Sequence, residues 1–332
     1  MINYKLLPKV ELHLHLDTSM RIETIRKFLI REKIDVPEPL EQFCVAPDKC
    51  ENLMDYLDRI VPALNALQST DAIEETAYQL VESLGEFNHL YTEIRFAPQL
   101  HLEKGESTQS ILNAALRGFK RGTKDFKTEI GVIICALRHL SKEENMDIAD
   151  LAIRNRENIA GFDLAANEEI SGNHQKIVFE KIKAAGIPIT VHAGEAMGPE
   201  RIDEAISVLN ARRIGHGVRL EENSELKKKI IDLQIPLEMC PTSNVQTNST
   251  ASYSTHPADR YLKENICVTI NTDSNTITPS NLTSEYEILG KTFGWGIEEF
   301  RKTQINAIDH SFLEKDKKAE LKRKFIELMI GK

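Results

Sequence analysis

The stretch KVELHLHLD, residues 9–17, decides the fold and carries the first chemical signal in the chain. Read with the period of two that a strand imposes, its aliphatic residues share one face, and the other face carries Glu11, His13, His15 and Asp17. Two histidines at i and i+2 on one strand face can bind the same metal ion. A strand with one solvated face explains the same alternation, so this stretch alone leaves both interpretations open.

Composition narrows the class of protein. The 332 residues, 41% of them hydrophobic, are enough for one large α/β domain, which we expect to span residues 1–332. A net charge of −9 without long Lys or Arg runs disfavours nucleic-acid binding. No apolar run approaches the roughly 18 residues of a membrane span, and the N-terminus lacks a signal-peptide pattern. Five scattered cysteines without a CxxC pair favour reduced thiols, so we expect a cytoplasmic protein.

Short apolar, β-prone runs alternate with longer helical patterns along the chain. There are eight such runs, at residues 9–17, 90–97, 130–137, 159–165, 187–193, 213–218, 235–240 and 266–272. Eight is the number of strands that closes a (β/α)8 TIM barrel, which is the α/β fold we predict. Additional helices are expected after the first strand, near 52–67 and 70–88, and in the C-terminal tail, from about 281 to 330. A doubly wound open sheet is the competitor, although no GxGxxG follows a strand.

Functional residues of such a barrel belong at the C-terminal ends of its strands, and polar side chains do gather there. The first run ends with His13 and His15, and the fifth continues into His192 and Glu195. The sixth carries His216, the seventh leads into CPTSN at 240–244, and the eighth leads into Asp273 and Ser274. Each of these side chains alone has an ordinary explanation as a turn, a cap or a satisfied polar group. Their shared position at the strand ends favours one site.

Three histidines and an aspartate make a nitrogen and oxygen ligand set. The set His13, His15, His192 and Asp273 suits Zn²⁺, one ion per chain, although Fe, Co or Mn can take similar ligands. A catalytic zinc lowers the pKa of a bound water to about 7, so hydrolytic chemistry is expected. Glu195 is the candidate general acid or base, and His216, flanked by glycines, is the candidate for orienting the attacking oxygen.

Six motifs together resemble the adenosine deaminases, a branch of the metal-dependent amidohydrolases. They are PKVELHLHLD (8–17), FDLAANE (162–168), VHAGE (191–195), IGHG (214–217), CPTSN (240–244) and NTD (271–273). Their order and spacing also agree, and the similarity runs from about residue 8 to residue 312.

The resemblance implies a role for each matching residue. It implies zinc ligands at His13, His15, His192 and Asp273, and a protonated Glu195 that donates to purine N1. It also implies that His216 and Asp273 position and deprotonate the attacking water. The residues expected to contact the substrate are His15, Asp17 at the ribose 5′-hydroxyl, Ala166, Ser274, and Leu53, Met54 and Leu57 of a helical lid. Simple core packing is an alternative for the three lid residues.

Three positions depart from the usual family pattern. Thr18 and Ala166 stand where the family usually has Gly, and Ser274 stands where many members have a second aspartate that contacts purine N7. A serine hydroxyl always carries a proton that it can donate, whereas an aspartate carboxyl group can donate a hydrogen bond only when it is protonated. Ala166 keeps its backbone N–H for purine N3 unless the position needs a positive φ. These changes bear on substrate preference more than on reaction type.

The leading hypothesis is zinc-dependent deamination of adenosine and 2′-deoxyadenosine to inosine and 2′-deoxyinosine. An alternative is deamination of another 6-aminopurine: adenine, 5′-deoxyadenosine or aminodeoxyfutalosine. The resemblance favours the nucleoside, because relatives acting on adenine or aminodeoxyfutalosine tend to carry Glu at the position of Asp17. A non-catalytic purine-binding protein is a third possibility, which the presence of all six metal and acid residues disfavours. The expected partner is therefore a small purine nucleoside, with no nucleic acid and no membrane.

Overall fold

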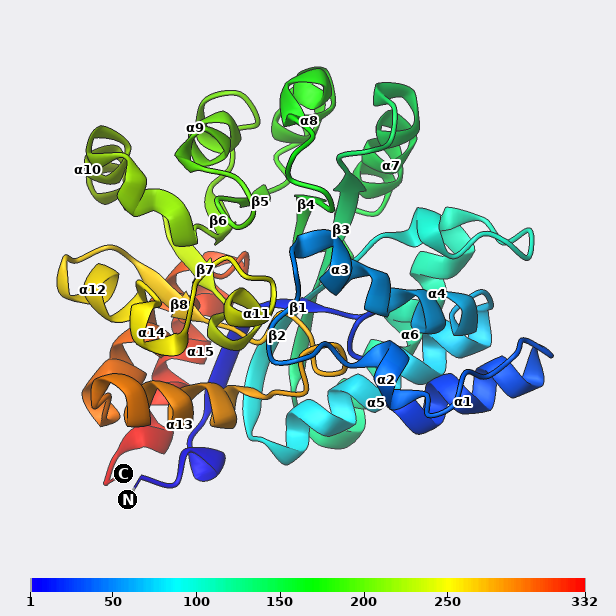
Figure 1. Cartoon of the computed structure of the whole chain (residues 1–332), viewed down its shortest axis with the longest axis horizontal. Helices are drawn as coiled ribbons and strands as arrows, with labels where there is room; N and C mark the ends of the chain where they lie inside the picture. The colour runs from blue at the N-terminus through cyan, green and yellow to red at the C-terminus, as the bar shows by residue number, and fades with distance from the viewer. Residues whose placement is uncertain (1, 332) are drawn as a thin grey trace.

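The computed structural model describes residues 2–331, and its centre is a ring of eight parallel strands (Figure 1). Their bounds are β1 Lys9–His15, β2 His89–Phe96, β3 Glu129–Leu137, β4 Gly161–Ala165, β5 Thr190–Ala193, β6 Arg213–His216, β7 Leu237–Met239 and β8 Val268–Ile270. Strands β1 to β4 form one sheet in sequence order and β5 to β8 form another. Isolated parallel bridges, Leu14 with Asp273 and Phe162 with Ile189, join the two sheets, so the ring closes. The predicted TIM barrel is confirmed.

Helices surround the strands and form the outer layer (Figure 1). After β1 come α1 Ile22–Arg31, α2 Glu41–Cys44, α3 Leu53–Leu57, α4 Val61–Ala66 and α5 Thr70–Glu86. The later helices are α6 Thr108–Phe126, α7 Lys142–Arg154, α8 Lys176–Ala184, α9 Pro199–Ser207, α10 Ser224–Leu233, α11 Pro241–Gln246, α12 Ala258–Lys263, α13 Leu282–Phe293, α14 Ile297–His310 and α15 Lys315–Met329. The local sequence determines where some helices begin: Ser107 and Ser141 form capping boxes at the N-termini of α6 and α7. None of the helices in residues 2–331 is long and apolar enough to cross a membrane.

The strands are short and almost fully buried, because helices cover the outside of the barrel and side chains fill its inside. One large hydrophobic cluster extends from Tyr4 to Met329 and includes residues of all eight strands. Charged side chains are also buried inside the barrel, and they bond to one another across it. Glu238 of β7 accepts hydrogen bonds from Arg95 of β2 at 2.8 Å and from Arg213 of β6 at 2.6 Å. This internal network fixes the floor beneath the strand ends.

Three details differ from the sequence-based expectation. The predicted helix at 52–67 is two short helices, α3 and α4, joined by a 3-10 turn at Asp58–Ile60. Two short helices, α11 at residues 241–246 and α2 at residues 41–44, have no counterpart among the helices expected from the sequence. The pairing of β1 with β2 shifts register between Glu11 and Leu14. Glu11 lines a separate hollow with residues of α5, while His13 reaches Glu238.

Candidate active site

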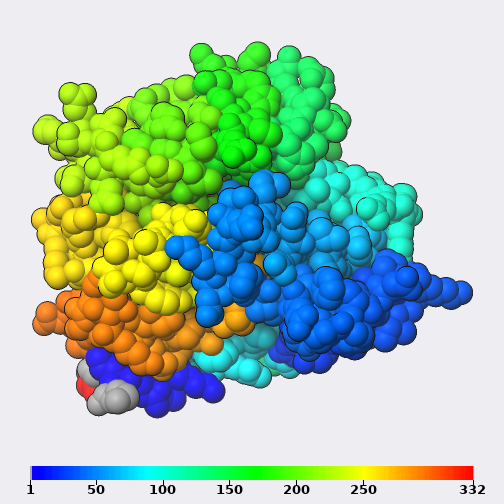
Figure 2. Space-filling model, in the orientation of Figure 1, coloured from blue at the N-terminus to red at the C-terminus, as the bar shows by residue number. Residues whose placement is uncertain are grey.

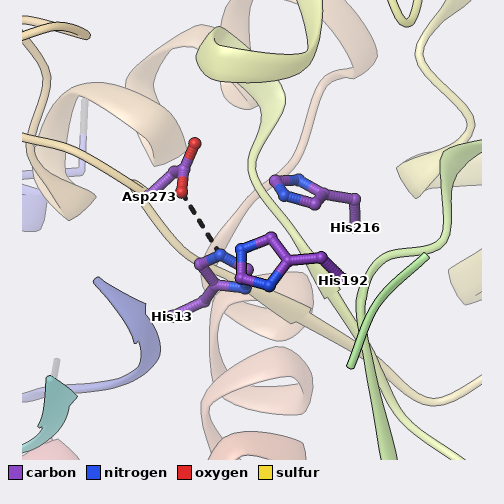
Figure 3. Close-up of side chains that lie close together, drawn as sticks. All are labelled: His13, His192, His216 and Asp273. Atoms are coloured by element: carbon purple, nitrogen blue, oxygen red, sulfur yellow. Dashed lines mark ion pairs between the residues drawn. The ribbon is translucent and has the colours of Figure 1, made fainter. Parts of the chain in front are cut away.

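The strand ends bring together, at one mouth of the barrel, four side chains of types that can ligate a metal ion (Figure 3). They are His13 from β1, His192 from β5, His216 from β6 and Asp273, which follows β8, and one ligand atom of each lies within 4.8 Å of all the others. All four residues are buried. Residues separated by up to 260 positions in the sequence therefore form one cluster, at the end of the barrel where the carboxyl ends of the strands converge.

His15 lies at the edge of the same cluster. Its Nε2 is 3.1 Å from Nε2 of His192 and 3.5 Å from Oδ1 of Asp273. Burial lowers the pKa of His15 well below its usual value, so the ring is neutral and can offer a lone pair. The sequence places this residue among the metal ligands, and the distances are compatible with that assignment.

Buried carboxylates hold the rings of His13 and His192. Nδ1 of His13 bonds Oε2 of Glu238 at 2.9 Å, and Nδ1 of His192 bonds Oδ1 of Asp163 at 3.2 Å. A carboxylate partner fixes the proton on Nδ1 and leaves Nε2 as the free lone pair, which is the usual arrangement behind a ligating histidine. Nε2 of His13 is buried, lies 3.2 Å from Oδ1 of Asp273 and makes no hydrogen bond.

The ring of His216 has the opposite arrangement. The side-chain oxygen of Asn244 accepts the backbone N–H of Cys240 at 3.2 Å, so the amide nitrogen faces Nδ1 of His216 at 3.0 Å. Nδ1 is then an acceptor, and burial lowers the pKa of His216 well below its usual value. The neutral ring must carry its proton on Nε2. We infer that His216 donates a hydrogen bond into the site and is not a metal ligand.

The distances among His13, His15, His192 and Asp273 suit one shared metal ion. Zinc bonds of about 2.0–2.1 Å place neighbouring ligand atoms roughly 3 Å apart. The three separations above, 3.1 Å, 3.2 Å and 3.5 Å, are close to that spacing. The buried and unbonded Nε2 of His13 is the kind of atom that a bound metal would satisfy. The donor set His13, His15, His192 and Asp273 therefore suits a metal ion of the zinc type.

Backbone bonds clamp Asp273 between β1 and β8. Its N–H donates to the carbonyl of His13 at 3.0 Å, and its carbonyl accepts the N–H of His15 at 2.8 Å. Its φ of 67° lies in the left-handed region, which costs energy for a residue with a side chain. Ser243 Oγ donates to its Oδ2 at 2.7 Å, and Glu11 accepts both the N–H and the hydroxyl of the preceding Thr272 at 2.7 and 2.6 Å. These contacts fix the carboxylate at the centre of the cluster.

Glu195 lies beside the cluster on the turn after β5, only 5% exposed. Burial, with the nearby carboxylates of Asp273 and Glu168, raises its pKa well above the usual value and so favours the protonated form. Its Oε2 lies 3.4 Å from Nε2 of His216. A protonated carboxyl in a buried site can act as a general acid.

The turn that carries Glu195 is anchored by Glu168, whose role the sequence did not suggest. The carboxylate of Glu168 accepts the backbone N–H groups of four consecutive residues: Gly194, Glu195 at 3.0 Å, Ala196 at 2.6 Å and Met197 at 2.9 Å. Only an acceptor without its own proton can serve four donors in this way. Glu168 therefore holds the backbone that positions the candidate acid.

A cavity of about 430 Å³ opens above these residues. His15, His192, His216, Glu195 and Asp273 line its floor, and its walls are largely apolar. The expected lid residues Leu53, Met54 and Leu57 all line it. Helix α3, which carries them, begins at an Asn52 cap and is tied to the β8–α13 loop by a hydrogen bond of 2.8 Å between Tyr56 Oη and Thr278 Oγ1. The volume falls within the range of pockets that enclose small molecules.

Two buried polar atoms at this cavity have no partner. Asp17 Oδ1 and Thr18 Oγ1 make no hydrogen bond, and both residues line the cavity. Burial raises the pKa of Asp17 to about 7. Buried polar groups normally have hydrogen-bond partners, so these two atoms indicate that the cavity binds a ligand with polar groups of its own.

Of the other two positions that depart from the family pattern, Ala166 lines the cavity and Ser274 does not. Ala166 lines the cavity with a φ of 74°, the left-handed conformation that the usual glycine adopts at little cost. Ser274 is not among the lining residues: its hydroxyl donates to the carbonyl of Thr18 and accepts the N–H of Ile277 at 3.0 Å. With its single proton used inside the loop, Ser274 is not brought to the cavity as the expected donor.

The comparisons with known proteins agree with the geometry of the site. A family model described as "Adenosine deaminase" matches residues 8–328. The chain belongs to the adenosine deaminase family. A protein named adenosine deaminase from Clostridium botulinum (strain 657 / Type Ba4) is 34% identical over 98% of this chain and 100% of its own length. Another with that name, from Enterococcus faecalis, is 36% identical over 96% of each chain. Family membership makes the chain a purine deaminase of the hydrolytic type.

Solved structures share the fold of this adenosine deaminase family chain. Adenine deaminase from Arthrobacter aurescens superposes with a TM-score of 0.91 at 24% identity, over 98% of this chain and 100% of that one. An amidohydrolase from Burkholderia ambifaria with bound Zn gives 0.90 at 23% identity, over 98% and 92%. N6-methyl-AMP deaminase from Arabidopsis thaliana gives 0.88 at 23% identity, over 99% of each chain. At these identities the comparison supports the fold alone.

Proposed function

We propose that this protein is a zinc-dependent deaminase of adenosine and 2′-deoxyadenosine, which releases ammonia and forms inosine or 2′-deoxyinosine. The observation that carries the proposal is the meeting of two features at one cavity. Glu195, which is buried and whose pKa is raised well above its usual value, lies beside a cluster whose distances suit one metal ion. Deamination requires an acid at purine N1 and an activated water at the adjacent carbon, C6.

The reaction follows from the protonation states of the side chains. Glu195 donates its proton to purine N1, and this draws electrons from C6 and makes that carbon electrophilic. A zinc ion held by His13, His15, His192 and Asp273 would lower the pKa of a water molecule to about 7. His216, protonated on Nε2, donates a hydrogen bond that orients the attacking oxygen and stabilises its charge. Asp273 accepts the proton of that water and passes it to the departing amine.

The preference for a nucleoside rests on Asp17, which lines the cavity. It offers an unpartnered oxygen, which suits a ribose hydroxyl. No Lys or Arg is among the described residues that line the cavity, whereas Asp17 and Asp58 are. A 5′-phosphate would meet carboxylates and no cation, which is unfavourable. Solved relatives have been crystallised with GMP and IMP; for this chain we propose the uncharged nucleoside.

Another 6-aminopurine is the competing substrate, since adenine deaminase is among the structures with the same fold. The decisive experiment measures ammonia release from adenosine, 2′-deoxyadenosine, adenine, 5′-deoxyadenosine and adenosine monophosphate on one preparation whose metal content is known. The proposal predicts the highest kcat/KM for the two nucleosides with a 5′-hydroxyl. Faster turnover of adenine or of the monophosphate would contradict it.

A non-catalytic purine binder is distinguished by the same preparation. Such a protein would bind adenosine without releasing ammonia, and Glu195→Gln would not change the ammonia released.

The proposed location of the enzyme is the cytoplasm. The five cysteines are consistent with this, since all are free and buried.

A further inference from the structure

Glu195 borders two cavities. Besides the one described above, a second hollow of about 570 Å³ lies between the entry to α3, the turn after β5, the 3-10 helix Val218–Glu222 and the end of α11. Its lining is polar and includes Arg219, Glu222, Asn248 and Ser249. Figure 2 shows the segment around α3 lying against the segment of α11 on this face of the molecule. Backbone bonds join them: Cys50 N–H donates to the carbonyl of Gln246 at 2.7 Å.

A chain of hydroxyl groups leads from Glu195 to this second hollow. Thr247 Oγ1 donates a hydrogen bond to Glu195 Oε1 at 3.1 Å, and Ser249 Oγ lies 2.7 Å from Thr247 Oγ1. Thr247 is only 4% exposed, whereas Ser249 is partly exposed and lines the hollow. A hydroxyl can accept one proton while it donates another. The two side chains thus form a continuous path from the buried carboxyl to a solvent-facing surface.

The proposed reaction leaves Glu195 in need of such a path. A purine with an amino group at C6 and water become a product with a proton on N1 and a carbonyl at C6, plus ammonia. The proton from Glu195 stays on N1 of the product. Of the two protons of water, one leaves with ammonia and the other is lost from the C6 oxygen to the Asp273 side when the carbonyl forms. To restore the resting state, one proton must leave that side and another must reach Glu195.

We propose that Thr247 and Ser249 are the relay through which Glu195 regains its proton from solvent after each turnover. The inference rests on the proposed deaminase function. In the inward step, Ser249 takes a proton from water, Thr247 takes one from Ser249, and the Glu195 carboxylate takes one from Thr247. Three O–H bonds form and three break, so the hydroxyls are unchanged and one proton has moved to Glu195.

A shorter internal route has poorer geometry. Nε2 of His216 lies 3.4 Å from Oε2 of Glu195, beyond the 2.7–3.2 Å range of good hydrogen bonds. The other nitrogen of His216 bonds Asn244 and the residue is 1% exposed, so this ring has no hydroxyl path of its own to the surface. The Thr247 route has a formed hydrogen bond to Glu195 and an exposed outer end.

The test compares Thr247→Val, which has nearly the same shape without the hydroxyl, with Thr247→Ser, which keeps it. Adenosine turnover is measured in the metal-loaded protein with increasing amounts of a small protonated buffer such as imidazolium. The relay predicts that Thr247→Val lowers kcat by about tenfold or more with little change in KM. It also predicts that imidazolium restores kcat in Thr247→Val but not in the parent, and that Thr247→Ser recovers most of the rate.

The possible outcomes are distinct. A kcat for Thr247→Val within about twofold of the parent would overturn the relay, as would a loss that buffer cannot restore, which would mean that Thr247 only orients Glu195. If Thr247→Val fails to fold, Ser249→Ala at the partly exposed position replaces it, with the same predicted loss of kcat and the same rescue. If the parent protein itself releases no ammonia from any 6-aminopurine, the proposed function fails and not the relay.

Discussion

Replacing Glu168 by Gln tests whether the turn that carries Glu195 depends on one buried carboxylate. Three backbone N–H groups bond its Oε2, and Gly194 N–H bonds its Oε1. With the amide oxygen in place of Oε2, three charged bonds become neutral, at a cost of about 1 kcal/mol each. The Gly194 N–H then faces an NH2 group, which costs about 1–3 kcal/mol. We expect the free energy of unfolding to fall by about 4–6 kcal/mol, which is a large part of the 5–15 kcal/mol that is typical of native proteins.

The loss should appear both in stability and in activity. Urea unfolding can be followed through the fluorescence of Trp295, the single tryptophan, which is buried. Glu169→Gln is the matched control, because the neighbouring Glu169 is exposed and its side chain makes no hydrogen bond in the described structure. We predict a clearly lower urea midpoint and a lower kcat for Glu168→Gln alone. If both variants match the parent in midpoint and kcat, the anchoring role of Glu168 is refuted.

Three further predictions concern the site itself. Glu195→Gln should lower kcat by about 10²–10⁴-fold with the metal content unchanged. In the parent, kcat/KM should fall as pH rises through the raised pKa of Glu195, because the donating form is lost, and the same pH profile of Glu195→Gln should lack that decline. Asp273→Ala should lose bound metal as measured by elemental analysis, and a strong chelator should inactivate the parent slowly. Asp17→Ala should lower kcat/KM for adenosine by roughly 10–150-fold, the equivalent of about 1.5–3 kcal/mol, and leave any turnover of adenine unchanged.

The barrel could be predicted from the sequence because its signals are local. Each buried parallel strand is a short apolar run, and polar residues such as His192 and Asp273 directly follow those runs. Knowing that strand ends converge in a barrel is then enough to bring the ligands together. The helix α11 and the division between α3 and α4 were not predicted, because their local signals are weak. Helix α11 has only six residues, and a single 3-10 turn separates α3 from α4.

The residues that position the ligands could not be predicted in the same way. Glu238 bonds His13 across 225 positions of sequence, and Glu168 bonds the turn of Glu195 from another strand end. Nothing in the local pattern distinguishes these carboxylates from surface charges, since their role appears only when the barrel closes. The register shift in β1 likewise depends on pairing with β2, which the period-two pattern of one strand does not contain.

Reaction of adenosine in water enriched in heavy oxygen tests the proposed chemistry most directly. We expect mass spectrometry to find one heavy oxygen on the base of the inosine formed, with one ammonia released per inosine. We expect no label in the ribose and no free base. Inosine without label in the base, or splitting of the nucleoside into base and sugar, would contradict hydrolytic attack at C6 in this site.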